Sequence, residues 1–209
     1  MRNTGKFWDK IAKKYAKSSI KNVEAYKETM DRTKAHLSKG DSVLEVGCGT
    51  GSTALLLADS VIRITASDIS ANMIDIARNK AKDQHVGNVT FVHSALFDDA
   101  LKAESFDVVL AFNMLHLLED TPAAIRRLSE LLKPGGLFIS KTVCVAEHGT
   151  LKLLRLPMYI GEKLGFVPYV KFLRIHALEE LITNENFQII ETGEYPPSPP
   201  SRFIVAKKI

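Results

Sequence analysis

Residues 42–51, SVLEVGCGTG, combine a short apolar run with three glycines at alternate positions. The run 42–47 predicts a buried strand, and Gly47, Gly49 and Gly51 allow the backbone to turn tightly into a helix over 50–59. A glycine-rich turn that opens a helix brings a ligand close to bare main chain, and its N–H groups can receive an anionic group. By itself, the same pattern also fits a tight strand-to-helix turn that binds nothing.

Strands and helices alternate after this stretch. Apolar runs predict strands over 62–68, 89–93, 106–112 and 137–144, with helices over 70–83 and 121–133 between them. Ser70 is expected to cap the first of these helices, and Thr121 the second, with Pro122 at its first position. Alternation of this kind is typical of a parallel sheet covered by helices.

The two ends of the chain add further elements. Helices are expected over 3–17, 22–37, 150–165 and 176–185, and strands over 187–194 and 202–208. The Pro-rich connection 195–201 is too short for a crossover helix, so the last two strands should pair antiparallel.

Composition excludes several classes of protein. The 209 residues are 45% hydrophobic and 25% charged, which is ordinary for one globular domain. No apolar run is long enough to span a bilayer, and the basic N-terminus lacks the apolar core of a signal peptide, so we expect a cytoplasmic protein. With two cysteines, neither a disulfide framework nor a metal cluster is supported. The net charge of +4 is concentrated on the first helix, where a solvated face explains it better than a nucleic-acid site.

Two carboxylates narrow the ligand of the glycine-rich turn. Asp68 ends the second strand, 68 − 47 = 21 residues after Gly47, where it can accept hydrogen bonds from ribose hydroxyls. Its alternative role is to cap the helix that follows. A nicotinamide dinucleotide site would place its third glycine at the position of Ser52, and Glu45 would repel a pyrophosphate. Glu45 instead suits a ligand with a cationic amine.

Four elements together resemble a class I S-adenosylmethionine-dependent methyltransferase. They are the stretch 45–51, Asp68, the fourth-strand run 106–113 and the run 132–137, and the resemblance covers about residues 40–145. It implies a Rossmann-like, doubly wound α/β fold with a seven-stranded sheet that is mostly parallel and has its last strand antiparallel. The expected single domain, 1–209, divides into a helical cap (1–40), a cofactor-binding core (41–145), a lid or specificity segment (146–175) and a C-terminal helix with a strand hairpin (176–209).

The resemblance also implies where S-adenosylmethionine and its product S-adenosylhomocysteine would bind. The glycines would pack against the amino-acid moiety, Asp68 would hold the ribose, and Ile69 and Ser94-Ala95 would flank the adenine. The full expected cofactor set is Glu45, Gly47, Cys48, Gly49, Gly51, Asp68, Ile69, Met73, Ser94, Ala95, Asn113 and Met114. The chain departs from the family after the third strand, where an acidic residue comes only at Asp98. Asp98 and Asp99 have an alternative reading as a helix N-terminus.

The methyl group would lie near the end of the fourth strand, beside Asn113 and His116. Methyl transfer depends mainly on alignment and the exclusion of water, so a general base is optional. His116 is expected either to accept a proton from the acceptor or to be a packed, hydrogen-bonded histidine. The run 113–116 lacks the Pro-Pro-aromatic pattern of amino methyltransferases and the carboxylate of metal-dependent catechol enzymes. A small-molecule or lipid-like acceptor and no metal are therefore expected.

Specificity is sought in residues 150–175, which mix apolar and basic side chains. They are expected to form a lid, an interfacial helix on an anionic membrane, or ordinary core. Trp8 and Tyr15 would close the acceptor pocket or belong to the core. The oligomeric state stays open. The alternative function is a noncatalytic S-adenosylmethionine-binding or regulatory module, which the intact cofactor set disfavours.

Overall fold

The computed structural model describes residues 4–147 and 155–209. Its centre is a seven-stranded sheet in the order β3-β2-β1-β4-β5-β7-β6. The strands are β1 (Ser42–Val46), β2 (Arg63–Asp68), β3 (Val89–His93), β4 (Phe106–Phe112), β5 (Leu132–Val143), β6 (Phe187–Pro197) and β7 (Pro200–Lys208). The pairs among β1 to β5 are parallel, and β7 pairs antiparallel with both β5 and β6. The expected seven-stranded sheet with an antiparallel last strand is confirmed.

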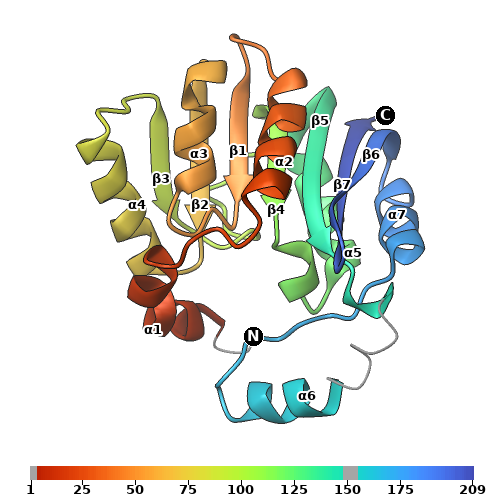
Figure 1. Ribbon diagram of the computed structural model, residues 1–209. Coiled ribbons are helices and arrows are strands. Elements are labelled where there is room, and N and C mark those ends of the chain that lie inside the picture. The colour runs from red at the N-terminus through yellow and green to blue at the C-terminus, as the bar shows by residue number, and fades with distance from the viewer. Residues whose placement is uncertain (1–3, 148–154) are drawn as a thin grey trace.

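Helices cover both faces of the sheet. They are α1 (Thr4–Ala16), α2 (Val23–Ala35), α3 (Ser52–Leu57), α4 (Ala71–Asp83), α5 (Thr121–Leu131), α6 (Arg155–Lys163) and α7 (Ile175–Thr183), with short 3-10 turns η1 (Ala58–Ser60), η2 (Leu115–Leu117) and η3 (Val145–Glu147). Figure 1 shows α2, α3 and α4 over one face and α5 with α7 toward the other. In the same view α1 and α6 lie beyond the edge toward which the parallel strands run.

The core consists of two apolar layers, one on each face of the sheet. Neighbouring residues of one strand point to opposite faces, so Leu44, Val109 and Phe138 belong to the layer beneath α5 and α7. Val43, Leu110 and Ile139 belong to the layer beneath α3 and α4. Burial on both faces explains why the strands read as continuous apolar runs.

Several expected boundaries were wrong. Asp120, not Thr121, caps α5, because the Asp120 carboxylate accepts a hydrogen bond from the Ala123 N–H at 3.0 Å. Strand β5 begins at Leu132, which pairs with Phe106, so it runs through the Pro-Gly-Gly segment expected to precede it. The expected helix over 150–165 is seen as α6, and its first residues lie outside the described ranges.

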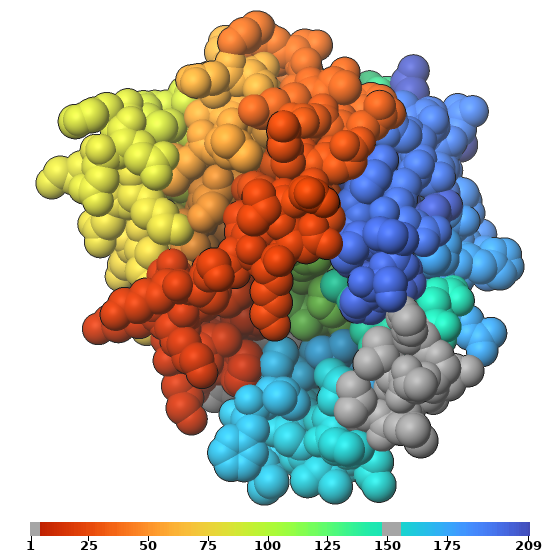
Figure 2. Space-filling model, viewed as in Figure 1, coloured from red at the N-terminus to blue at the C-terminus, as the bar shows by residue number. Residues whose placement is uncertain are grey.

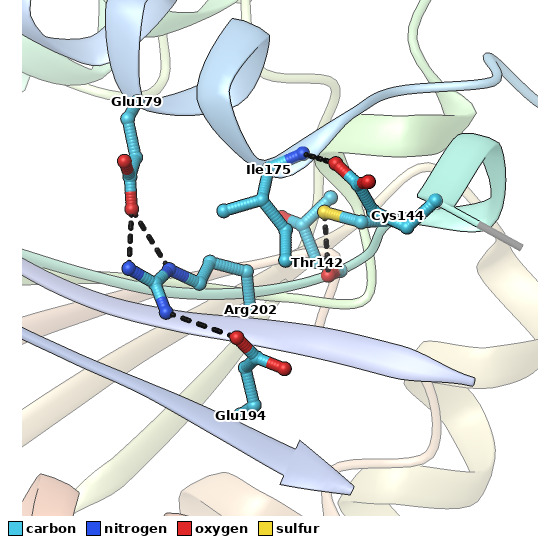
Figure 3. A network of polar contacts seen from close by, with 7 residues as sticks. Thr142, Cys144, Ile175, Glu179, Glu194 and Arg202 are labelled. Carbon is cyan, nitrogen blue, oxygen red and sulfur yellow. Dashed lines mark hydrogen bonds and ion pairs between the residues drawn. The ribbon is translucent and has the colours of Figure 1, made fainter. Parts of the chain in front are cut away.

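An arginine in β7 attaches the C-terminal hairpin to α7. Arg202 donates two hydrogen bonds to Glu179 at 2.8 and 2.6 Å and lies 3.4 Å from Glu194 of β6 (Figure 3). The chain after β5 is held nearby, since the Ile175 N–H donates to the Glu147 carboxylate at 2.9 Å. These contacts fix the antiparallel edge of the sheet beside the end of β5.

Candidate functional site

The glycines of the loop after β1 are required by their surroundings. Gly47, Gly49 and Gly51 all have positive φ angles, between 53 and 76°. A Cβ at Gly51 would lie 2.6 Å from the Phe91 ring, and one at Gly47 would lie 2.9 Å from Cγ of Met114. The loop is therefore packed tightly between β3, α4 and the segment after β4.

The N–H groups of this loop are used inside the protein. Those of Gly47 and Cys48 donate to the Ser67 carbonyl at 2.8 and 3.0 Å, and that of Gly51 donates to the Cys48 carbonyl at 3.0 Å. The Gly49 N–H donates to Oδ2 of Asp68 at 2.8 Å. The N–H groups of Gly47, Cys48, Gly49 and Gly51 therefore already have acceptors inside the protein and are not offered to an anion. A pyrophosphate at this loop would be repelled by the Asp68 carboxylate, which already accepts the Gly49 N–H.

Asp68 holds both the loop and the start of α4. Its Oδ1 accepts from the Ser70 N–H at 2.9 Å, and Ser70 caps the helix by accepting from the Met73 N–H at 3.2 Å. Burial raises the pKa of Asp68, and the two backbone hydrogen bonds oppose that rise. Each carboxylate oxygen has a second lone pair, so Asp68 can accept further donors from a ligand. The alternative reading of Asp68 as the helix cap is wrong, because Ser70 caps α4 and Asp68 accepts the N–H of that capping residue.

Glu45 is a buried carboxylate with an unused oxygen. It is 3% exposed, and among the described residues its Oε2 has no hydrogen-bond partner. Burial raises the pKa of Glu45 to about 8, with a further contribution from Asp68. An orphaned carboxylate oxygen beside a glycine loop fits a ligand that brings a cation.

The segment after β3 is joined to Asp68. The Ser94 N–H donates to the Asp68 carbonyl at 3.1 Å, while Oδ2 of Asp98 accepts from the Ala95 N–H at 2.7 Å. Asp98 therefore closes a turn, and its alternative reading as a helix N-terminus is wrong because 94–105 contain no helix. Ile69 is 40% exposed, whereas Met73 is buried within the protein.

Helix α1 brings an acidic residue that the sequence reasoning missed. The Ser70 hydroxyl donates to the Asp9 carboxylate at 2.6 Å, and the Asn72 N–H donates to the same oxygen at 3.1 Å. Hydrogen bonding to Ser70 is the main reason that the pKa of Asp9 is lowered. Helix periodicity gave no signal for this contact, because it joins positions 61 residues apart.

Tyr15 and Trp8 lie at the cofactor side of the site. A Cβ at Gly49 would lie 3.8 Å from Cε1 of Tyr15, and the Tyr15 and Trp8 rings meet edge to face at 6.2 Å. Burial raises the pKa of Tyr15, and the charges of Asp68 and Glu45 add to the rise. The structure thus brings Tyr15 to the same carboxylates that surround the glycine loop.

The segment after β4 carries the expected methyl-transfer residues. Asn113 has a φ of 54°, and its N–H donates to the Lys141 carbonyl at 2.7 Å. Met114 packs on Gly47, which links this segment to the glycine loop. His116 is 9% exposed in η2, burial lowers its pKa to about 4, and its Nδ1 has no partner among the described residues. Its carbonyl accepts from the Lys171 N–H at 2.7 Å.

A family model described as a methyltransferase domain matches residues 43–136, which run from β1 into β5. That range contains the glycine loop, Asp68 and the segment after β4. The chain belongs to the class I S-adenosylmethionine-dependent methyltransferases.

Curated relatives include methyltransferases of quinone biosynthesis. The ubiquinone biosynthesis O-methyltransferase of Rickettsia akari (strain Hartford) is 30% identical over 162 residues, covering 75% of this chain and 62% of that protein. The demethylmenaquinone methyltransferase of Oceanobacillus iheyensis is 28% identical over 150 residues, covering 70% and 58%. This chain thus spans about six tenths of the length of these two relatives.

Solved methyltransferase structures share the fold. A methyltransferase of Thermotoga maritima, described as a possible histamine N-methyltransferase, superposes with a TM-score of 0.72 at 22% identity and covers 98% of this chain and 99% of its own. Within 4–147 and 155–209, no three His, Cys, Asp or Glu side chains are placed to hold a metal ion. No helix in those ranges has the length and apolarity of a membrane span.

Proposed function

We propose that this protein transfers a methyl group from S-adenosylmethionine to a small-molecule or lipid-like acceptor. The observation that carries the proposal is the pair of buried carboxylates, Glu45 and Asp68, at a loop whose three glycine N–H groups are already bonded within the protein. S-adenosylmethionine carries two positive charges, on its sulfonium and its ammonium, and one negative charge. A site with two carboxylates, in which the glycine N–H groups already have acceptors, favours such a ligand over a dinucleotide.

The residues divide the work of binding and alignment. When bound, S-adenosylmethionine supplies an electrophilic methyl group. Glu45 pairs with the ammonium, Asp68 accepts from the ribose hydroxyls, and the Ser94-Ala95 turn with Ile69 borders the adenine. Asn113 and Met114 line the methyl end, and Tyr15 with Trp8 closes the site from α1, which helps to exclude water. The proposal includes no metal ion.

His116 is available as a base in its neutral form. Because its pKa is lowered to about 4, the imidazole carries no charge at neutral pH. A base with so low a pKa is weak, so it assists only an acceptor whose proton is already acidic or is lost as the methyl group transfers.

The acceptor is proposed to have a quinol-type ring and to be reached at a membrane surface. Support comes from the names of the curated relatives and from an exposed apolar patch on and after α6, consisting of Leu156, Tyr159, Ile160, Leu164 and Phe166, each at least 50% exposed. Figure 2 shows this part of the chain at the lower rim of the molecule. With Lys163 exposed beside it, the patch suits peripheral contact with an anionic bilayer from the cytoplasmic side. Segment 146–175 would then act as the specificity segment.

A ligand titration tests the proposal. S-adenosylhomocysteine at a hundredfold excess over its Kd should stabilise the fold by about 2.7 kcal/mol, and NAD should not. Tritiated methyl transfer into a lipid or small-molecule fraction of cell extract would then show catalysis. Binding without transfer to any fraction would favour a noncatalytic module, and an unchanged melting temperature with S-adenosylhomocysteine would refute the proposal.

A further inference from the structure

Lys141 is a cation buried at the carboxyl end of β5. Its side chain lies on the face covered by α2, the residue is 9% exposed, and its Nζ donates to the Thr29 hydroxyl at 3.2 Å. The Thr29 hydroxyl in turn donates a hydrogen bond to the Ala25 carbonyl at 2.6 Å. An ammonium group has three N–H donors. Among the described residues, Thr29 is the only one that accepts a hydrogen bond from the Lys141 Nζ.

Lys141 also has no counter-charge. No carboxylate within 4–147 and 155–209 forms an ion pair with it, and residues 1–3 and 148–154 contain no Asp or Glu. Glu191, which lies against α2, is engaged by Arg32 at 2.6 Å and His36 at 2.7 Å. Burial lowers the pKa of Lys141. A cation that is desolvated and unpaired destabilises a fold, so its presence here calls for a reason outside packing.

The position of Lys141 supplies that reason. Its carbonyl accepts the Asn113 N–H, and Asn113 precedes Met114, which packs on Gly47 of the cofactor loop. In the register of the sheet, Glu45 is aligned with Leu110, and Leu110 with Ile139, two residues before Lys141. Lys141 and Glu45 therefore share one face of the sheet, two strands apart and with about 12 Å between their Cα atoms.

Two buried ionisable side chains, one acidic and one basic, thus lie on the same face of the sheet, and neither forms an ion pair within the described residues. Glu45 lies at the glycine loop and matches the cationic amine of the cofactor. Lys141 lies two strands away, and its carbonyl accepts the N–H of Asn113, the first residue after β4. We propose that Lys141 binds a carboxylate of the methyl acceptor, so that the acceptor is an organic acid. This inference rests on the proposed function and names the chemical class of its acceptor.

The test compares aromatic diols that differ by one carboxylate. Protein saturated with S-adenosylhomocysteine is titrated calorimetrically with 1,4-dihydroxynaphthalene against 1,4-dihydroxy-2-naphthoate, and with catechol against 3,4-dihydroxybenzoate. The wild-type protein should bind the acid of at least one pair about tenfold or more tightly than the neutral diol, since a charged hydrogen bond is worth that much. Lys141→Met should abolish the preference. Lys141→Gln keeps a donor for Thr29 and should abolish it too, which covers the case in which the methionine variant does not fold.

Lys207→Met is the matched control, because Lys207 is exposed on β7 and its loss changes the net charge equally. It should keep the preference for the acid. Equal affinity for acid and diol in both pairs, no binding of either acid, or a preference that survives in the Lys141 variants would overturn the inference. A tenfold loss of S-adenosylhomocysteine affinity in Lys141→Gln would also overturn it, because Lys141 would then serve the cofactor's carboxylate. If the wild-type protein binds no S-adenosylhomocysteine, it is the proposed function that fails.

Discussion

The Gly49 N–H donates to the Asp68 carboxylate at 2.8 Å, so the residue expected to hold the ribose also fixes the cofactor loop. Asp68→Ala removes this acceptor and the one for the Ser70 N–H. We expect S-adenosylmethionine affinity to fall about ten- to a hundredfold and the free energy of unfolding to fall by about 1 to 3 kcal/mol. Calorimetric titration and a denaturant melt measure the two effects. An unchanged Kd in a folded variant would refute the ribose assignment.

Glu45 should make cofactor binding depend on pH. Since its pKa is raised to about 8, Glu45 is mostly protonated at pH 7, and an arriving ammonium should release that proton. S-adenosylhomocysteine affinity should therefore rise as pH approaches 8. Titration at pH 7 in two buffers of different ionisation enthalpy counts the protons released. Glu45→Gln should release none, and equal proton release in both proteins would contradict this assignment.

The same group predicts how stability changes with pH in the absence of ligand. A carboxyl whose folded pKa is raised contributes stability that is present below its unfolded pKa, about 4.3, and is lost as pH rises through the folded value of about 8. Wild-type protein should thus lose more stability than Glu45→Gln between pH 5 and 8 in denaturant melts. Parallel curves for the two proteins would show that Glu45 is not desolvated as described.

Gly51 should tolerate no side chain. A Cβ there would lie 2.6 Å from Phe91 and 2.8 Å from Ala77, at a φ of 76°. Gly51→Ala should cost about 2 to 4 kcal/mol of stability. Gly87→Ala is the matched control, because no atom lies within 4 Å of its Cβ position and the substitution should change stability by less than about 1 kcal/mol. Similar losses in both variants would indicate that the packing of Gly51 is not decisive.

His116 should show its role in the pH dependence of turnover. If His116 acts as a base, His116→Gln should lower turnover about 10² to 10⁴-fold and leave cofactor affinity unchanged. With a pKa lowered to about 4, it should produce no loss of rate between pH 5 and 8. If packing is its role, the variant should lose stability and keep turnover. A rise of wild-type turnover with pH that has its midpoint near pH 6.5 and is absent in the variant would contradict the lowered pKa of this histidine.

The α6 patch should bind anionic vesicles through its apolar side chains. Ile160→Asp should lower the affinity for phosphatidylglycerol vesicles, measured by sedimentation, about tenfold. The reason is that the free energy gained by burying an isoleucine side chain corresponds to at least that factor. Ile190→Asp is its matched control, since Ile190 is 47% exposed on β6 and Ile160 is 50% exposed on α6. Equal binding by the two variants, or equal binding to phosphatidylcholine, would refute an anionic membrane contact at α6.

The order of helices and strands could be predicted because it depends on local patterns. Apolar runs, helix caps such as Ser70 and the short Pro-rich connection before β7 each act over a few residues, and they predicted the separate strands and the antiparallel pairing of the last two. That all seven strands form one sheet was implied by the family resemblance. The capping error at α5 was of the same local kind, since Asp120 and Thr121 are adjacent and both can cap a helix.

The sequence by itself determined the strand, the glycine loop and the carboxylates at Glu45 and Asp68, because these depend on spacing along the chain. Only the tertiary structure decided how their polar atoms are paired. It gave the Gly49 N–H to Asp68, docked Asp9 on Ser70 and left Lys141 without a counter-charge, although a lysine inside the apolar run 137–144 was a signal for it. Partners that lie 19, 61 and 112 residues apart are chosen by packing between layers, and no local periodicity specifies them.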